Sequence, residues 1–186
     1  MIHAPRPRSQ RTIGRPVAVE GVGYWSGRAN RVVLEPAAAG AGVVFVRADL
    51  DCPVRIPATA EYRVPAAGRT NLVAAGVRVE MIEHVMSALA GLEIDCCVVR
   101  VHGEELPGLD GSALAFVEAI EAAGGVDLGS TVDPLVVSET VRVGGDDAWI
   151  EASPPEFAGL SVEYVLDYGP GPIGRQSWSG RLDPGC

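Results

Sequence analysis

The stretch VEMIEHVMSALAGLEIDCCVVRV, residues 79–101, decides the fold because it joins a helical pattern directly to a strand pattern. Apolar residues recur at helical spacing in its first part: Ile82, Val85, Met86 and Leu89. Polar residues fall on the other side: Glu80, Glu83, His84 and Ser87. This pattern predicts an amphipathic helix. The nearly continuous apolar run Ile94–Val101 predicts a strand covered on both faces.

Short strand patterns broken by glycine precede that stretch. They occupy Val17–Val22, Arg31–Glu35 and Gly42–Val46. Residues Asp49–Arg69 contain three prolines, and we expect one short strand there, around Val54–Ala60. Strands followed by a helix and another strand are typical of an α+β layer.

A second helix is predicted after the turn-rich loop Gly103–Ser112. Its apolar face would consist of Ala113, Phe116, Val117 and Ile120. Asp110 or Ser112 would cap its start, and Gly124-Gly125 would end it. A nucleophilic role for Ser112 is the alternative, but no histidine is placed by the sequence to activate it.

The predicted fold class is therefore α+β, a two-layer sheet-and-helix domain followed by an incomplete second domain of similar type. We expect a disordered tail over residues 1–11, the first domain over 12–128 and a linker over 129–134. Residues 135–186 would be the incomplete start of the second domain.

Strand patterns without a covering helix fill the last part of the chain. They are Leu135–Val143, Ala148–Ala152 and Leu160–Asp167, and the last of them alternates. Residues 176–186 contain residues typical of turns, and no further helix or strand is predicted there. Strands with one uncovered apolar face make a poor independent domain, so we expect a chain truncated within its second domain.

Composition restricts the classes of function. The chain has 186 residues, 47% of them hydrophobic, and a net charge of −9. All of its 15 basic residues are arginines, because the sequence contains no lysine. An acidic balance argues against a nucleic-acid partner. No apolar run is long enough for a transmembrane segment, and Met1–Arg15 lacks the apolar core of a secretory signal, so a cytoplasmic protein is expected.

The four cysteines, Cys52, Cys96, Cys97 and Cys186, show no C-x-x-C spacing. Neighbouring strand residues point to opposite faces, so Cys96 and Cys97 are poorly placed to share a metal. Buried free thiols are the interpretation that this spacing favours.

The pair Glu83-His84 joins a candidate base to a candidate metal ligand. A catalytic zinc takes three protein ligands and a water molecule, and Glu83, about 100° round the helix from His84, could reach that water. A solvated polar helix face is the alternative, and spacing alone favours it. A mixed site of His84 with His102 is conceivable, although an exposed polar loop with Glu104 and Glu105 also explains His102.

Several ordered motifs resemble the UDP-3-O-acyl-N-acetylglucosamine deacetylases, from about Thr12 to the end of the chain. They are Gly21–Gly27 (GVGYWSG), Gly42–Leu50 (GVVFVRADL), Arg69–Leu72 (RTNL), the Glu83-His84 helix, Gly91–Asp95 (GLEID) and Leu106–Ala113 (LPGLDGSA). The resemblance implies two α+β domains and a zinc-dependent amidase of lipid A biosynthesis. Its substrate would be UDP-linked, acylated N-acetylglucosamine, from which it releases acetate.

Carried over by position, Glu83 is the general base and His84 is a ligand of Zn²⁺. Thr70 lies in the loop near metal and substrate. Trp25 stands where many members have a substrate-proximal histidine, which puts that contact in doubt, and Arg69–Leu72 replaces a more threonine-rich version.

The other two zinc ligands of the family come from a His-x-x-x-Asp helix, which this sequence lacks. The resemblance places them beyond Cys186, so the 186 residues alone are expected to be inactive. A second hypothesis is a noncatalytic half-enzyme that binds the nucleotide sugar or a complementary carboxy-terminal half.

Overall fold

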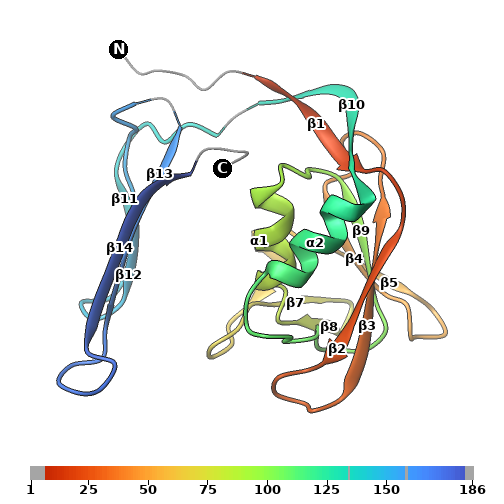
Figure 1. The fold of residues 1–186 in the computed structure, drawn as a ribbon, viewed down its shortest axis with the longest axis horizontal. Coiled ribbons are helices and arrows are strands. Elements are labelled where there is room, and N and C mark those ends of the chain that lie inside the picture. The colour runs from red at the N-terminus through yellow and green to blue at the C-terminus, as the bar shows by residue number, and fades with distance from the viewer. Residues whose placement is uncertain (1–6, 134, 158, 183–186) are drawn as a thin grey trace. The chain divides into compact units, whose positions relative to one another are not determined.

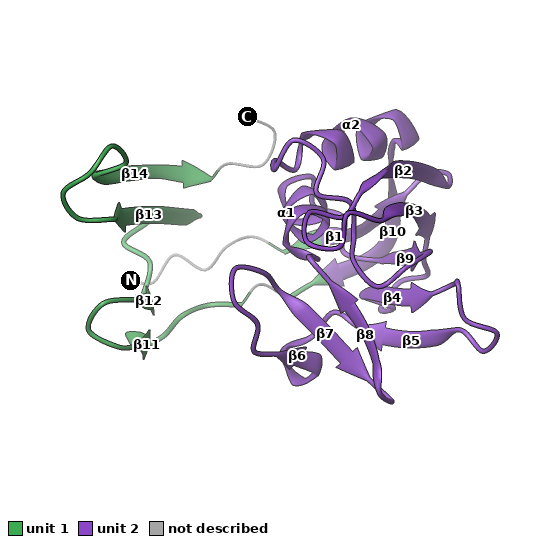
Figure 2. Ribbon diagram, turned by 90° about the horizontal axis from the view of Figure 1, so that it is seen from below, with its two compact units in different colours: residues 1–8, 132–186 green, residues 9–131 purple. Residues whose placement is uncertain are grey.

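The computed structural model describes residues 7–133, 135–157 and 159–182, which divide into two compact units (Figure 2). Residues 9–131 form one unit, and the described residues outside that range form the other. The larger unit holds sheets together with helices α1 (Glu83–Gly91) and α2 (Leu114–Ala123). It confirms the α+β class that the joined helix and strand patterns predict.

A five-stranded sheet forms the centre of the larger unit (Figure 1). In spatial order its strands are β2 (Val17–Val22), β3 (Ala29–Pro36), β9 (Cys97–Val101), β4 (Val43–Arg47) and β5 (Val54–Pro57). Neighbouring strands are antiparallel except β4 and β9, which run parallel with Phe45 opposite Val99. A parallel pair needs a crossover, and the chain that includes α1 provides it.

Helices α1 and α2 pack against each other, and α2 also contacts β2. Both strands and helices contribute to one buried cluster, whose fully enclosed large side chains include Leu34, Phe45, Val85, Leu89, Val99 and Phe116. Burying each such side chain contributes roughly 1.5–3 kcal/mol. The predicted apolar faces of both helices therefore hold them on the core.

The predicted strand Ile94–Val101 is shorter in the structure and is buried mainly on one face. Strand β9 begins at Cys97, and only Cys96 before it makes a bridge, to Thr12. Along β9, Cys97, Val99 and Val101 are buried, whereas Val98 and Arg100 are half-buried. The prediction of two covered faces is therefore confirmed for one face only, because the face of Val98 and Arg100 is half-buried.

Glu80 lies in a strand and not on the polar face of the helix, where the sequence analysis placed it. A three-stranded sheet consists of β6 (Arg63–Val64), β7 (Asn71–Ala74) and β8 (Val77–Glu80), and a 3-10 helix, η1 (Ala60–Tyr62), precedes it. Met81, with φ of 59°, then turns the chain into α1, which begins only at Glu83. The strand pattern is too short to stand out beside the helical one.

Regular structure also occupies positions predicted as tail and linker. Strand β1 (Arg8–Ile13) pairs with β10 (Gly125–Val132), so residues 8–11 and 129–132 are parts of a two-stranded sheet. The rest of the predicted tail, residues 1–6, lies outside the described residues. Gly124, with φ of 72°, separates α2 from β10 as predicted.

The smaller unit contains two antiparallel hairpins. One pairs β11 (Val141–Gly144) with β12 (Trp149–Ala152), and the other pairs β13 (Leu160–Asp167) with β14 (Arg175–Leu182). Strand β11 is shorter than predicted. Strand β14 lies where turn chemistry was predicted, because its serines, glycine and arginines resemble a turn until they pair with β13.

Large apolar side chains in these hairpins are exposed, as the uncovered strand patterns predict. Tyr164 and Trp178 lie opposite each other in the β13–β14 ladder and are 56% and 53% exposed. None of the helices in the described part of the chain has the length and apolar character needed to cross a membrane.

Candidate functional site

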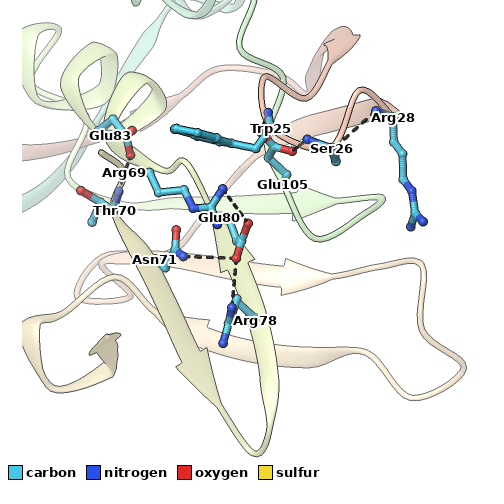
Figure 3. A network of polar contacts seen from close by, with 10 residues as sticks. All are labelled: Trp25, Ser26, Arg28, Arg69, Thr70, Asn71, Arg78, Glu80, Glu83 and Glu105. Carbon is cyan, nitrogen blue, oxygen red and sulfur yellow. Dashed lines mark hydrogen bonds and ion pairs between the residues drawn. The ribbon is translucent and has the colours of Figure 1, made fainter. Parts of the chain in front are cut away.

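Glu83 and His84 are the first two residues of α1, and both are half-buried. The start of the helix is tied to the segment before β7 by two hydrogen bonds. The backbone N–H of Ile82 donates to Thr70 O at 3.2 Å, and the backbone N–H of Thr70 donates to Glu83 Oε2 at 2.9 Å (Figure 3). The structure therefore brings together Glu83 and Thr70, two of the predicted site residues.

This contact orients the Glu83 carboxylate. One of its oxygens is fixed by the Thr70 amide, so the direction of the other is set by the planar geometry of the group. Negative charge in the first turn is also favourable beside the helix N-terminus. A carboxylate held in one orientation next to an imidazole suits the transfer of a proton to and from a bound molecule.

His84 lies close enough to the loop before α2 to influence Asp110. Two hydrogen bonds from Ser112, from its backbone N–H at 2.9 Å and its Oγ–H at 2.8 Å, lower the pKa of Asp110, and the charge of His84 lowers it further. Ser112 Oγ in turn accepts the N–H of Leu114, the first residue of α2. Ser112 thus contacts the helix start, but the prediction of Asp110 or Ser112 as the cap was wrong, because Ala113 is at the N-cap position and no side chain caps the helix there.

A complete metal site is not present in the described part of the chain. No three His, Cys, Asp or Glu side chains gather there as metal ligands would. The described residues therefore do not form the mixed site of His84 with His102 and its neighbouring acids. His84 alone fits a zinc ion as one imidazole ligand out of three.

The fourth predicted residue, Trp25, lies in the turn between β2 and β3. The residue is 55% exposed, and its ring meets Tyr24 edge to face at 5.4 Å and has its centroid 5.1 Å from the guanidinium carbon of Arg69. Arg69 is the residue before Thr70 (Figure 3). A short path of contacts therefore leads from Trp25 through Arg69 and Thr70 to Glu83.

Two buried carboxylates that the sequence analysis misplaced hold this region together. Glu105 was expected in an exposed loop, yet it is 5% exposed and accepts the backbone N–H groups of Trp25 and Ser26, each at 2.7 Å. Glu80 accepts Asn71 Nδ2 and Arg78 Nη1, each at 3.2 Å. Both partners of Glu105 are about 80 positions away in sequence, and the only sequence signal is the apolar Leu106-Pro107 that follows it.

A hollow of about 470 Å³ opens beside the turn that carries Trp25. Its lining includes Trp25, Arg69, Glu80, His102 and Glu105. Glu83 and His84 are not part of it, but Arg69 joins its wall to the Thr70–Glu83 contact. The prediction of buried free thiols is confirmed for Cys96 and Cys97 but is wrong for Cys52, whose free thiol is exposed. Cys186 lies outside the described residues.

The sequence matches the profile of a protein family described as UDP-3-O-acyl N-acetylglycosamine deacetylase over residues 10–185. Curated relatives named UDP-3-O-acyl-N-acetylglucosamine deacetylase include those of Anaeromyxobacter dehalogenans, 41% identical over 174 residues, and Myxococcus xanthus, 41% identical over 164. A third, from Shewanella denitrificans, is 38% identical over 167 residues. These matches cover 94%, 88% and 89% of this chain but 55%, 52% and 54% of the relatives. The chain spans about half the length of the curated relatives it matches.

Proposed function

The chain belongs to the UDP-3-O-acyl N-acetylglycosamine deacetylase family, and from that premise we propose that it supplies the base-bearing part of an amidase. The proposed substrate is UDP-linked, 3-O-acylated N-acetylglucosamine, and the products are acetate and the free amine, in lipid A biosynthesis. The observation that carries the proposal is the Glu83 carboxylate, fixed by Thr70 beside His84 at the start of α1.

Glu83 has the role of general base. Water attacks the carbonyl carbon of the acetamide while Glu83 removes its proton. The C–N bond then breaks, the amine nitrogen takes up the proton that Glu83 removed, and acetate leaves after its acid proton is lost to solvent. The Thr70 amide keeps the Glu83 carboxylate aimed during these steps, since it holds one oxygen at 2.9 Å. Such positioned proton transfer contributes typically about 10²–10⁴-fold to a rate.

His84 is proposed as one protein ligand of Zn²⁺, and the fit rests on its half-buried imidazole one residue after the base. When bound, zinc would polarise the amide carbonyl as a Lewis acid. The two further ligands would come from the part of the relatives that this chain does not span. Thr70 and Trp25 are proposed to lie beside the substrate, Thr70 because it contacts Glu83 and Trp25 because it is an exposed aromatic residue.

The domain organisation is also part of the proposal. Residues 12–128 would form the first domain and residues 135–186 the beginning of a second one, with residues 129–134 between them. The exposed Tyr164 and Trp178 support this division, because a covering layer would bury them. A carboxy-terminal half is the partner that would provide it. Family membership does not favour the noncatalytic alternative. Free thiols at Cys96 and Cys97 suit the cytoplasm as the proposed compartment.

The test is complementation with zinc present. The 186-residue chain is mixed or coexpressed with the carboxy-terminal half of the Anaeromyxobacter dehalogenans relative, and acetate release from the UDP-linked substrate is measured. We expect deacetylation by the mixture and little by either part alone, together with one zinc per complex that is lost in His84→Ala. A complex that forms but neither binds zinc nor releases acetate would contradict the proposal.

A further inference from the structure

The turn Gly23–Gly27 is held in place by one buried carboxylate. Glu105 Oε1 accepts the backbone N–H of Trp25 and Oε2 accepts that of Ser26, each at 2.7 Å (Figure 3). Hydrogen bonds to a charged acceptor are short and about twice as strong as neutral ones. Because both donors are backbone N–H groups, this pair of bonds fixes the main chain at Trp25. It therefore fixes the direction in which the Trp25 side chain points from its Cα.

The protonation state of Glu105 agrees with this role. Burial alone would raise the pKa of Glu105. The bonds from Ser26 and Trp25, together with the charge of Arg69, outweigh that effect and hold the pKa below its ordinary value of 4.5. Glu105 is therefore charged near neutral pH, where both of its oxygens accept hydrogen bonds.

Gly23 shows how closely the turn approaches the carboxylate. A Cβ added at Gly23 would lie 2.5 Å from both Glu105 Oε2 and Ser26 Oγ. Gly23 itself is closed into the turn by its N–H, which donates to Arg28 O at 2.9 Å, and by its O, which accepts the Gly27 N–H at 3.0 Å. A side chain at this position would displace the Glu105 carboxylate and the Ser26 hydroxyl from their present places.

Arg69 fixes the Trp25 ring from the other side. Its guanidinium carbon lies 5.1 Å from the ring centroid, within the range of a cation–π contact. Its Nη1 is 3.6 Å from Glu80 Oε2, an ion pair longer than a normal hydrogen bond. The side chain of Arg69 is 24% exposed and that of Glu80 is 11% exposed. Glu80 is itself anchored by Asn71 and Arg78, so the cation cannot leave the ring without losing this partner.

We propose that Glu105 is the positioning residue that sets the direction of Trp25, with Arg69 as its counterpart across the ring. Trp25 needs such support because the residue is 55% exposed and its ring has Tyr24 and Arg69 as its partners in ring contacts. The inference rests on the proposed function for the identity of the molecule that Trp25 faces. The claim that Glu105 holds the Trp25 turn in one conformation does not depend on that function.

The first test measures the turn itself, in the full 186-residue chain carrying Trp149→Phe and Trp178→Phe, so that Trp25 is the only tryptophan. Glu105→Gln keeps the shape of the side chain but turns one acceptor into an NH₂ donor that faces a backbone N–H. We expect a loss of nanosecond anisotropy of Trp25 and a rise in acrylamide quenching of up to about twofold. Glu104→Gln, at the exposed neighbouring acid, should change neither quantity.

Circular dichroism will show whether Glu105→Gln folds. If it does not, two further variants test the same contact. Gly23→Ala should release the turn from the opposite side of the same contact and lower the anisotropy in the same way. Arg69→Met removes the cation and leaves Glu105 intact, so it should lower the anisotropy by a smaller amount. Folded variants whose Trp25 anisotropy equals that of the parent would overturn the inference.

The second test uses the complemented enzyme and separates positioning from general stability. Glu105→Gln should raise KM by roughly tenfold and leave kcat within about twofold, because a misdirected Trp25 affects binding more than proton transfer. An equal loss in kcat without a change in KM would contradict the assignment. If the parent releases no acetate while the anisotropy changes occur, the proposed function fails and the positioning role stands.

Discussion

At the scale of residues, charged groups with backbone partners shape the candidate site. Glu83 accepts the Thr70 amide and Glu105 accepts two amides of the Trp25 turn. Each carboxylate is thereby fixed by main-chain atoms, which move less than side chains do. A charge held in this way provides orientation as well as stability.

The stabilisation by Glu105 should depend on pH. Its pKa is lowered from 4.5 in the folded chain, so its contribution is present above about pH 4.5 and is lost as the pH falls through the lower folded value. We expect the difference in free energy of unfolding between the parent and Glu105→Gln to be constant above about pH 5 and to shrink below it. Urea denaturation over a series of pH values measures this difference.

Other acids should not disturb that comparison. Asp49 and Asp110 also have lowered pKa values, but they titrate in both proteins and their contributions cancel. A difference that stays constant or grows towards low pH would contradict the assignment of the charged, hydrogen-bonded form to Glu105.

Sequence reasoning could find Glu83, His84 and Ser112 but not the partners of the buried acids. The first three lie in local patterns, a helix period and a turn before a helix. Glu80 and Glu105 look like surface acids. Glu80 lies in a strand of four residues, too short for its pattern to stand out, and the partners of the Glu105 carboxylate, Trp25 and Ser26, come from a distant segment. Long-range pairing of this kind leaves no periodic signal in the chain.

At the scale of elements, the end of α2 depends on a backbone conformation that glycine adopts most easily. Gly124 has φ of 72° and ψ of 157°, and its N–H closes the helix on Ile120 O and Glu121 O. We expect Gly124→Ala to lower the free energy of unfolding by about 1–3 kcal/mol. Thermal or urea denaturation followed by circular dichroism measures the change.

Gly91, the last residue of α1, is the matched control for this substitution. It has no atoms within 4 Å of an added Cβ. Gly91→Ala should be neutral or stabilise the chain by up to about 1 kcal/mol, because alanine has the higher helix propensity. Equal effects of the two substitutions would show that φ at Gly124 is not what limits the end of α2.

Long and strongly patterned elements were predictable, whereas short or polar ones were not. Strand β2 has the predicted bounds Val17–Val22, since β-branched residues recur along it. Strands β7 and β8 have four residues each and precede a stronger helical pattern. Glu80 fits that helical pattern as well, so it was assigned to the helix. Strand β14 contains serines and a glycine, and only its pairing with β13 makes it a strand.

At the scale of the whole molecule, the larger unit encloses its core, whereas the smaller unit exposes apolar side chains. Tyr164 and Trp178 form a cross-strand pair that is more than half exposed. Exposed apolar patches of this kind mark surfaces that associate. The chain alone should therefore self-associate through the β13–β14 hairpin.

Replacing Trp178 tests this expectation. Trp178→Ser should weaken self-association by roughly tenfold in sedimentation velocity, as the loss of an aromatic anchor does at interfaces. Ser179→Ala, at the adjacent position on the opposite face of the strand, should leave association unchanged. Undiminished association of Trp178→Ser would place the contact surface elsewhere.

The most direct test of the account is the kcat for acetate release by the complemented enzyme carrying Glu83→Gln. The amide keeps the size of the side chain but cannot take a proton from water, so we predict a fall of about 10²–10⁴-fold. Ser87→Ala, on the exposed side of the same helix, should keep the parent rate. A Glu83→Gln enzyme that folds, binds zinc and releases acetate at the parent rate would contradict the role of Glu83 as base.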